Sequence, residues 1–146
     1  MEKVQPTQPR LGLNVYQTQS AISMLKQAFS NNLAKTLNLK RVSAPLFVDP
    51  TTGLNDDLNG VERPVEFDIK RTGTNAQVVH SLAKWKRMAL YSYGFPVGEG
   101  LYAEMNAIRR DDDMDALHSI YVDQWDWEKV IDRKSRNMDT LRTTVQ

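Results

Sequence analysis

The sequence has 146 residues, of which 40% are hydrophobic and 25% charged, a length and composition typical of one globular domain with a real core. Its 19 basic and 18 acidic residues leave a formal net charge of +1 without a basic cluster, which excludes the usual kind of nucleic-acid or membrane-binding surface. The chain has no cysteine, no apolar signal segment and no run of about 18 apolar residues, so disulfides and thiolate sites are excluded and a cytoplasmic location is expected.

The first predicted elements are an arm and a long helix. Residues 1–13 are polar and contain two prolines, so we expect a short flexible arm. Asn14, with Gln17 three residues later, is typical of a capping pair that starts a helix. Apolar residues then recur at spacings of three, four and seven, which predicts a helix that ends near Asn38 and has one face in a core or an interface. These apolar residues are Val15, Ile22, Leu25, Phe29, Leu33 and Leu37.

The next segments read as strands and loops. Residues 41–48 have a strand pattern that Pro45 interrupts, and a residue without an amide donor belongs at an edge, a bulge or a subunit boundary. Residues 50–60 form a polar loop. Alternation of apolar and polar side chains predicts strands over residues 65–69 and 77–80, joined by a turn.

The second half is predicted to hold a helix, two paired strands and the start of another helix. Residues 82–93 have helical composition, and glycine and proline follow them. Residues 101–108 and 120–127 are best interpreted as paired strands on either side of an acidic loop. Residues 138–146 favour a helix without a stop signal. The fold class is therefore α+β with a largely antiparallel sheet.

The densest polar pattern lies on the second of those strands. Gln124, Asp126 and Glu128 alternate with Trp125 and Trp127, so the polar side chains should lie on one face and the tryptophans on the other. Polar groups in such a strand often mark a functional site. The pattern alone leaves open a solvent-facing strand with a buried tryptophan face.

Other polar residues allow two interpretations each. Ser81 is predicted to cap the helix that follows it, and the cations of that helix are by composition a solvated face rather than a substrate clamp. His80 and His118 are core or site residues, and they lack the spacing of a metal site. The acidic run at residues 111–113 is interpreted as a solvated loop rather than a Mg²⁺ site.

Three of these segments resemble the bacterial ammonia-dependent asparagine synthetases. They are HSLAKWKR at 80–87, GEGLY at 98–102 and HSIYVDQWDWE at 118–128, and APLF at 44–47 and DDLNGVE at 56–62 extend the resemblance over nearly the whole chain after the arm. The resemblance implies an antiparallel sheet of the class II aminoacyl-tRNA synthetase type, flanked by helices. On this basis residues 14–146 are expected to be the N-terminal part of such a catalytic domain.

The chain is more distantly similar to the aspartyl- and asparaginyl-tRNA synthetases. The helix over residues 14–38 and the strand with Pro45 resemble their motif 1, which implies a homodimer through these elements. Residues 108–111 and 118–126 resemble the two strands of motif 2, although Val122 stands where that family has phenylalanine. Ser81 and Lys86 match the serine and lysine of the segment that reads aspartate.

The resemblance implies a ligase that uses ATP to convert L-aspartate and ammonia into asparagine through an aspartyl-adenylate. Arg109 would bind the α-phosphate and the reacting carboxylate, and Lys86 would pair with that carboxylate. The remaining assignments are Asp56, Ser81, Gln124 and Asp126 to the amino acid, and Leu117, His118 and Ser119 to the AMP portion of ATP.

The resemblance also implies what to expect beyond this chain. Family members are longer, and the motif with the Mg²⁺ carboxylates would lie after residue 146. The 146 residues alone are therefore expected to be inactive, incomplete and poorly soluble. An anticodon-binding domain would not fit before Asn14, which argues against tRNA charging. The alternatives are a non-catalytic synthetase-like paralogue or binding module, and a structural protein with a polar sheet face.

Overall fold

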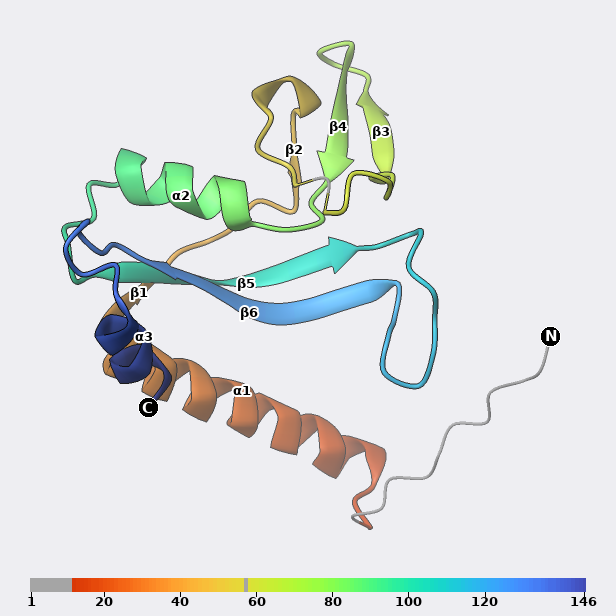
Figure 1. Cartoon of the computed structure of the whole chain (residues 1–146). Coiled ribbons are helices and arrows are strands. Elements are labelled where there is room, and N and C mark those ends of the chain that lie inside the picture. The colour runs from red at the N-terminus through yellow and green to blue at the C-terminus, as the bar shows by residue number, and fades with distance from the viewer. Residues whose placement is uncertain (1–11, 57) are drawn as a thin grey trace. The chain divides into compact units, whose positions relative to one another are not determined.

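The computed structural model describes residues 12–56 and 58–146, in which helices and two sheets form an α+β fold (Figure 1). The chain divides into two compact units, Met1–Asn32 and Leu33–Gln146. The predicted arm, residues 1–13, falls almost entirely outside the described residues. Within the described part, no helix is both long and apolar enough to span a bilayer.

Helix α1 (Val15–Leu37) begins at the predicted capping pair. The Asn14 N–H donates to Gln17 Oε1 at 2.9 Å, and the Gln17 N–H donates to Asn14 Oδ1 at 2.8 Å. Each side chain therefore satisfies an amide that the helix start leaves without a partner. The helix ends where Asn38 adopts a left-handed conformation with φ 57°, a geometry that asparagine tolerates better than most residues.

The apolar face predicted for this helix is buried only near its end. Leu33 and Leu37 pack with Leu39, Tyr102 and other apolar residues of the second unit. In the first unit the earlier members of the face are exposed, and 80% of Val15 and 68% of Leu25 are accessible. Those residues are not core residues within this chain, and an interface stays a prediction for them.

The first sheet has the order β1–β5–β6. Strands β5 (Gly100–Ile108) and β6 (Tyr121–Lys129) pair antiparallel over nine residues each, which confirms the predicted pairing. Strand β1 (Leu39–Arg41) runs parallel to β5, with Leu39 opposite Gly100. The sequence did not predict this parallel edge, because its partners are about 60 residues apart.

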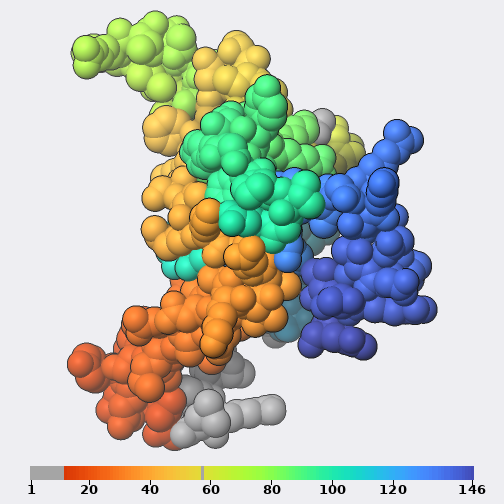
Figure 2. Space-filling view, turned by 90° about the vertical axis from the view of Figure 1, so that its left-hand side faces the viewer, coloured from red at the N-terminus to blue at the C-terminus, as the bar shows by residue number. Residues whose placement is uncertain are grey.

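The second sheet has the order β2–β4–β3 and is antiparallel. It contains β2 (Phe47–Val48), β3 (Glu66–Ile69) and β4 (Thr74–Val78). Two expectations were wrong: the strands form two sheets rather than one, and residues 41–48 are not one strand. The segment around Pro45 instead leads from β1 in one sheet to β2 in the other, since proline cannot donate a ladder hydrogen bond. In the space-filling view the β3–β4 hairpin, coloured yellow-green, stands out from its surroundings (Figure 2).

The β3–β4 turn is shorter than predicted. Thr74 already belongs to β4, because Gly73 adopts a φ of 66° and its N–H donates to the Ile69 carbonyl at 2.9 Å. A left-handed glycine closes such a turn at little steric cost. Strand β4 also ends at Val78, so His80 lies in the connection to the next helix rather than in a strand.

Helix α2 (Ala83–Ser92) lies along one face of the β5–β6 pair (Figure 1). Odd-numbered residues of β5 point toward the helix because side chains alternate along a strand. The resulting core contains Val79, Leu82, Trp85, Ala89, Leu90, Leu101, Ala103, Met105 and Ala107. The predicted helix at the end of the sequence is α3 (Met138–Val145), which Asn137 caps by accepting the Thr140 N–H at 2.9 Å.

Gly100 sits where three strands approach closely, and we expect Gly100→Ala to be destabilising. A Cβ atom there would lie 2.3 Å from the Glu128 carbonyl oxygen and 2.7 Å from Leu39 Cδ2. Neither β1 nor β6 can retreat without loosening its pairing with β5, so we expect a loss of about 1–3 kcal/mol. Urea unfolding measures this loss. An unchanged midpoint would contradict the close approach of the strands at this position.

Candidate active site

The most buried charge in the described structure is the ammonium group of Lys86. The residue is 5% exposed and projects from α2 toward β6. Its Nζ forms an ion pair with Asp126, donates to the Trp127 carbonyl at 2.9 Å and lies 3.5 Å from Glu128 Oε2. Two carboxylates and a carbonyl therefore compensate for the desolvation of one buried cation.

This cluster bears on the two interpretations of strand β6. The predicted division of its faces is confirmed, since Asp126 and Glu128 meet Lys86 while Trp125 packs against the other cluster with Tyr102. The polar face is half-buried where Asp126 and Glu128 meet Lys86 of α2, whereas Gln124, farther along the same face, is exposed. The interpretation of Lys86 as part of a solvated helix face was wrong. Composition assigns lysine to the surface, but here its partners come from a strand 40 residues later.

Gln124 and Arg109 lie on the same side of the sheet as this cluster. Gln124 is opposite Met105, and Asp126 is opposite Ala103, so both share the face of the buried β5 residues. Arg109 follows β5 directly, and its N–H donates to the Ile120 carbonyl at 2.8 Å, which continues the ladder by one residue. Alternation then places Arg109 on the face of Met105 and Gln124. Ile120 lies opposite Arg109, and it is four residues, roughly 13 Å along the strand, from Gln124.

The two neighbouring arginines have different surroundings. Arg109 Nε is buried and has no hydrogen-bond partner among the described residues. Arg110 is exposed, and its Nε lies 3.8 Å from Asp111 Oδ1. A buried guanidinium nitrogen with such a donor suits an anion that arrives later, whereas Arg110 already faces a carboxylate.

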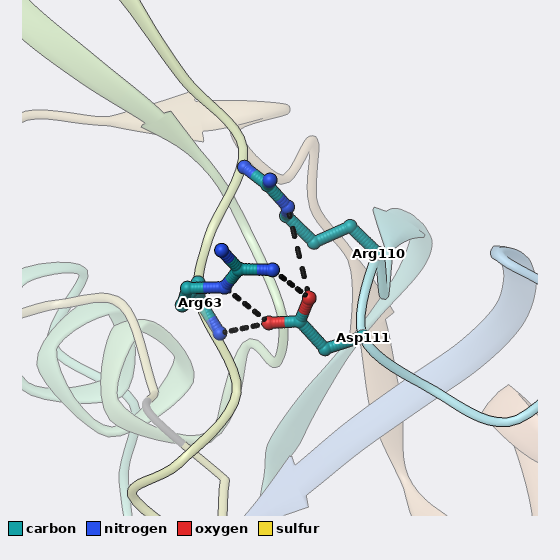
Figure 3. Close-up of polar contacts among 3 residues, drawn as sticks. All are labelled: Arg63, Arg110 and Asp111. Atoms are coloured by element: carbon teal, nitrogen blue, oxygen red, sulfur yellow. Dashed lines mark hydrogen bonds and ion pairs between the residues drawn. The ribbon is translucent and has the colours of Figure 1, made fainter.

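Asp111 ties the end of β5 to the segment before β3 (Figure 3). Arg63 donates to it from Nε at 2.9 Å, from an Nη atom at 2.6 Å and from its backbone N–H at 2.8 Å. These hydrogen bonds from Arg63 hold the pKa of Asp111 well below its ordinary value of 3.8. Asp111 is exposed, as the sequence interpretation of a solvated loop expected, but the sequence did not indicate its specific partner 48 positions earlier.

This contact predicts a specific acid dependence of stability. Folding lowers the pKa of Asp111. Its ionised carboxylate therefore contributes to the free energy of unfolding above its unfolded pKa near 4, and this contribution is lost as the pH falls through the pKa of the folded state. The difference in unfolding free energy between the parent chain and Asp111→Asn should therefore be constant near neutral pH and shrink below about pH 4. Urea unfolding at several pH values measures it, and a difference that persists unchanged at low pH would contradict the contact.

The three residues assigned to AMP lie in the exposed segment before β6. Asp115 shapes it by accepting the Leu117 N–H at 2.7 Å and the His118 N–H at 2.8 Å, and its Oδ1 also lies 2.9 Å from His118 Nδ1. These bonds, that to the Leu117 N–H foremost, lower the pKa of Asp115 to about 2. Ser119 Oγ accepts the Tyr121 N–H at 3.3 Å. The sequence interpretation missed Asp115, although Asp is a common turn residue two or three positions before such amides.

Asp56 and Ser81 lie near a second polar group, centred on Asn55. The Asn55 side chain accepts the N–H of His80 at 2.9 Å and donates to the Val78 carbonyl at 3.2 Å, which ties the loop to the end of β4. The sequence interpretation missed this asparagine. Ser81 was predicted to be the N-cap of α2, but Leu82 occupies that position and Ser81 Oγ accepts the Ala83 N–H at 3.2 Å.

The structure therefore brings together only part of the predicted site. Lys86 and Asp126 are in contact, and Gln124 and Arg109 share their face of the sheet. Asp56 lies with His80 around a separate small pocket, and residues 117–119 lie in the β5–β6 connection. In the described part of the chain, no group of three His, Asp or Glu side chains is arranged to hold a metal ion.

Together the fold and the site define an α+β protein with a buried acid–base cluster on the helix-covered face of an antiparallel strand pair. The model of the aspartate–ammonia ligase family matches residues 16–146. The chain belongs to that family.

Curated relatives agree with this assignment. The chain is similar to the aspartate–ammonia ligase of Clostridium perfringens strain SM101, with 63% identity over 92% of the chain and 40% of the relative. It is 61% identical to the ligase of Ruminiclostridium cellulolyticum over 97% of the chain and 43% of that protein. The chain is 60% identical to the aspartate–ammonia ligase of Bacillus mycoides over 92% of the chain and 41% of that protein. The chain thus spans about two fifths of the length of these relatives.

Proposed function

We propose that the chain acts in an aspartate–ammonia ligase that makes L-asparagine from L-aspartate, ammonia and ATP. The observation that carries this proposal is the Lys86–Asp126–Glu128 cluster on the sheet face that Gln124 and Arg109 share. Membership of the family and the printed names of the relatives support the same reaction.

The cluster matches two of the charges of a bound aspartate. Aspartate carries one ammonium and two carboxylates, so Lys86 can pair with the side-chain carboxylate and Asp126 with the ammonium. Glu128 would then keep Lys86 in place after Asp126 has turned to the substrate. Asp56, Ser81 and Gln124 complete the proposed amino-acid site. Because substrate charges replace existing ionic partners, binding would leave no charge of this cluster unpaired.

The proposed chemistry has two steps. The aspartate side-chain carboxylate attacks the α-phosphorus of ATP, and pyrophosphate leaves with the electrons of the broken P–O bond. Ammonia then attacks the acyl carbon, AMP leaves, and the nitrogen releases its excess proton. Arg109 would stabilise the first step by holding the α-phosphate and the carboxylate with its planar fork while negative charge shifts between them.

The remaining parts of the proposal concern ATP, metal and assembly. Leu117, His118 and Ser119 would lie along the AMP portion of ATP. Mg²⁺ would be held mainly by the phosphates and by groups outside the described residues, as is usual for this ion. A homodimer through the exposed face of α1 and the Pro45 segment would cover apolar side chains such as Leu25 and Leu46. We propose a cytoplasmic location and no nucleic-acid partner.

The test joins residues 1–146 to the remaining part of the Clostridium perfringens relative. We expect exchange of labelled pyrophosphate into ATP that requires aspartate and does not require ammonia, because adenylation precedes amide formation. Asparagine should form only when ammonium is added. If the fusion folds but exchanges no pyrophosphate with aspartate, the proposed activity is wrong and the non-catalytic alternative is favoured.

A further inference from the structure

One polar contact joins the two sheets of the second unit directly. Arg63 lies three residues before β3 of one sheet, and Asp111 lies three residues after β5 of the other. The Asp111 carboxylate accepts from Nε at 2.9 Å, from an Nη atom at 2.6 Å and from the backbone N–H of Arg63 at 2.8 Å. Figure 3 shows the two side chains meeting between their segments. The contact therefore fixes the end of β5 relative to the start of β3.

The geometry of this contact is more specific than that of an ordinary surface ion pair. Exposed pairs usually contribute little to stability, because two long side chains must be ordered for one weak attraction. Here the guanidinium of Arg63 donates to both oxygens of Asp111 as a fork, and the backbone N–H of Arg63 adds a third bond. A fork sets direction as well as distance. The contact is thus suited to holding two segments in a defined relation.

The segment that ends at Arg63 is held at both of its ends. At its start, the Asn55 side chain is hydrogen-bonded to the end of β4 and to the segment before α2. Leu58 adopts a φ of 52°, a left-handed conformation that a residue with a side chain seldom adopts unless surrounding contacts impose it. At its end, Arg63 is fixed by Asp111. The segment carries Asp56, whose position therefore depends on contacts with both sheets.

The proposed adenylation needs groups on both sides of this contact. Asp56, proposed to bind the amino acid, precedes Arg63 in the same segment. Arg109, proposed to bind the α-phosphate and the carboxylate, stands two residues before Asp111, and the Asp112 N–H donates to the Arg109 carbonyl at 3.3 Å. A displacement of Asp111 would pass to Arg109 through this turn. Because a misplacement of about an ångström slows a reaction strongly, the relation of the two segments matters most in the transition state.

We infer that Arg63 and Asp111 are positioning residues for the adenylation step, because their contact holds the segment of Asp56 in a fixed relation to the end of β5 and Arg109. Neither side chain touches a substrate in this role, and no bond forms or breaks at either one. The inference rests on the proposed function, since adenylation is the step that requires this alignment.

Arg63→Gln and Asp111→Asn, each in the fusion protein described above, test this role. We expect either variant to lower the kcat of aspartate-dependent pyrophosphate exchange at least about tenfold and to change the KM for ATP less than about twofold, because binding contacts remain and only their alignment is lost. The double variant should be no slower than the slower single variant, since both changes break the same contact. Unfolding midpoints above the assay temperature verify that the variants are folded.

Lys40→Gln is the matched control for these variants. The ion pair between Lys40 and Glu99 is exposed to a similar extent as that between Arg63 and Asp111. It lies within the first sheet, however, between β1 and the residue before β5. Its loss should therefore leave the kcat of exchange within about twofold of the parent value.

Three kinetic results would overturn the inference. If Asp111→Asn slows exchange and Arg63→Gln does not, Asp111 acts on a substrate directly. If the two losses multiply in the double variant, the residues act separately. If neither variant slows exchange more than Lys40→Gln does, the contact has no positioning role. A parent fusion without exchange contradicts the proposed function instead.

A distance measurement tests the contact without catalysis. The chain has no cysteine, so spin labels attach selectively to Arg71→Cys in the β3–β4 turn and Glu104→Cys on β5, both at exposed positions. Double electron–electron resonance on residues 1–146 should give one narrow distance distribution, which broadens when Arg63→Gln is added and stays unchanged with Lys40→Gln. A distribution that is already broad in the labelled parent, or that keeps its width in Arg63→Gln, would overturn the inference even if the fusion were inactive.

Discussion

Replacing Arg109 with lysine is expected to lower aspartate-dependent pyrophosphate exchange by about 100- to 1,000-fold in the completed ligase. An ammonium group cannot hold a phosphate oxygen and a carboxylate oxygen together in the planar geometry of a guanidinium. Loss of one oriented donor to the developing charge costs a factor of this size in other enzymes. The buried Nε, which has no hydrogen-bond partner in the described part of the chain, indicates that Arg109 has this donor to offer.

Arg110→Lys is the matched control for this change. Arg110 is exposed and its Nε lies 3.8 Å from the Asp111 carboxylate, so exchange should stay within about threefold of the parent value. If Arg110→Lys abolished exchange and Arg109→Lys did not, the assignment along the chain would be wrong by one residue. If neither variant had an effect, the adenylation mechanism would have to be abandoned.

Replacing Lys86 with methionine is expected to lower the unfolding free energy by about 3–5 kcal/mol. Methionine keeps most of the volume but leaves Asp126 and Glu128 facing each other without their shared cation. Removal of one partner from a buried ionic group is costly because the remaining charge stays desolvated. Urea unfolding measures the loss independently of activity.

Arg142→Ala is the control for Lys86→Met. The ion pair between Arg142 and Asp139 lies on the surface of α3, where the two side chains are 70% and 90% exposed, respectively. It should cost less than about 1 kcal/mol. Adding Asp126→Asn and Glu128→Gln to Lys86→Met should restore much of the lost stability, because the uncompensated charges disappear. A loss no larger than that of Arg142→Ala would contradict the burial of the cluster.

The elements that sequence patterns predicted are those whose signal is local. Asn14 and Gln17 are three positions apart, and their capping contact is present. Strands β5 and β6 follow one another across the loop at residues 109–120, and side-chain alternation predicted the faces of Gln124 and Trp125. Such features depend on neighbouring residues, whose spacing is readable without knowledge of the fold.

The features that sequence patterns missed depend on distant partners. The burial of Lys86 requires carboxylates on β6, and the contact of Asp111 requires Arg63, 48 residues away. Asn55 likewise acts through the N–H of His80. Composition assigns each of these residues to the surface, since it gives no information on which segments meet in space. The roles of the predicted site residues stay predictions that the variants above can test.

The parallel edge formed by β1 also bears on how the second unit folds. Strands β5 and β6 can pair early because only residues 109–120 separate them, whereas Leu39 and Gly100 must first close a loop of about 60 residues. Loop closure costs entropy before any contact compensates for it, so β1 should join after the β5–β6 hairpin has formed. A nascent chain would then hold β1 without a docking partner until the ribosome had released β5, the only strand beside which β1 lies in the described structure.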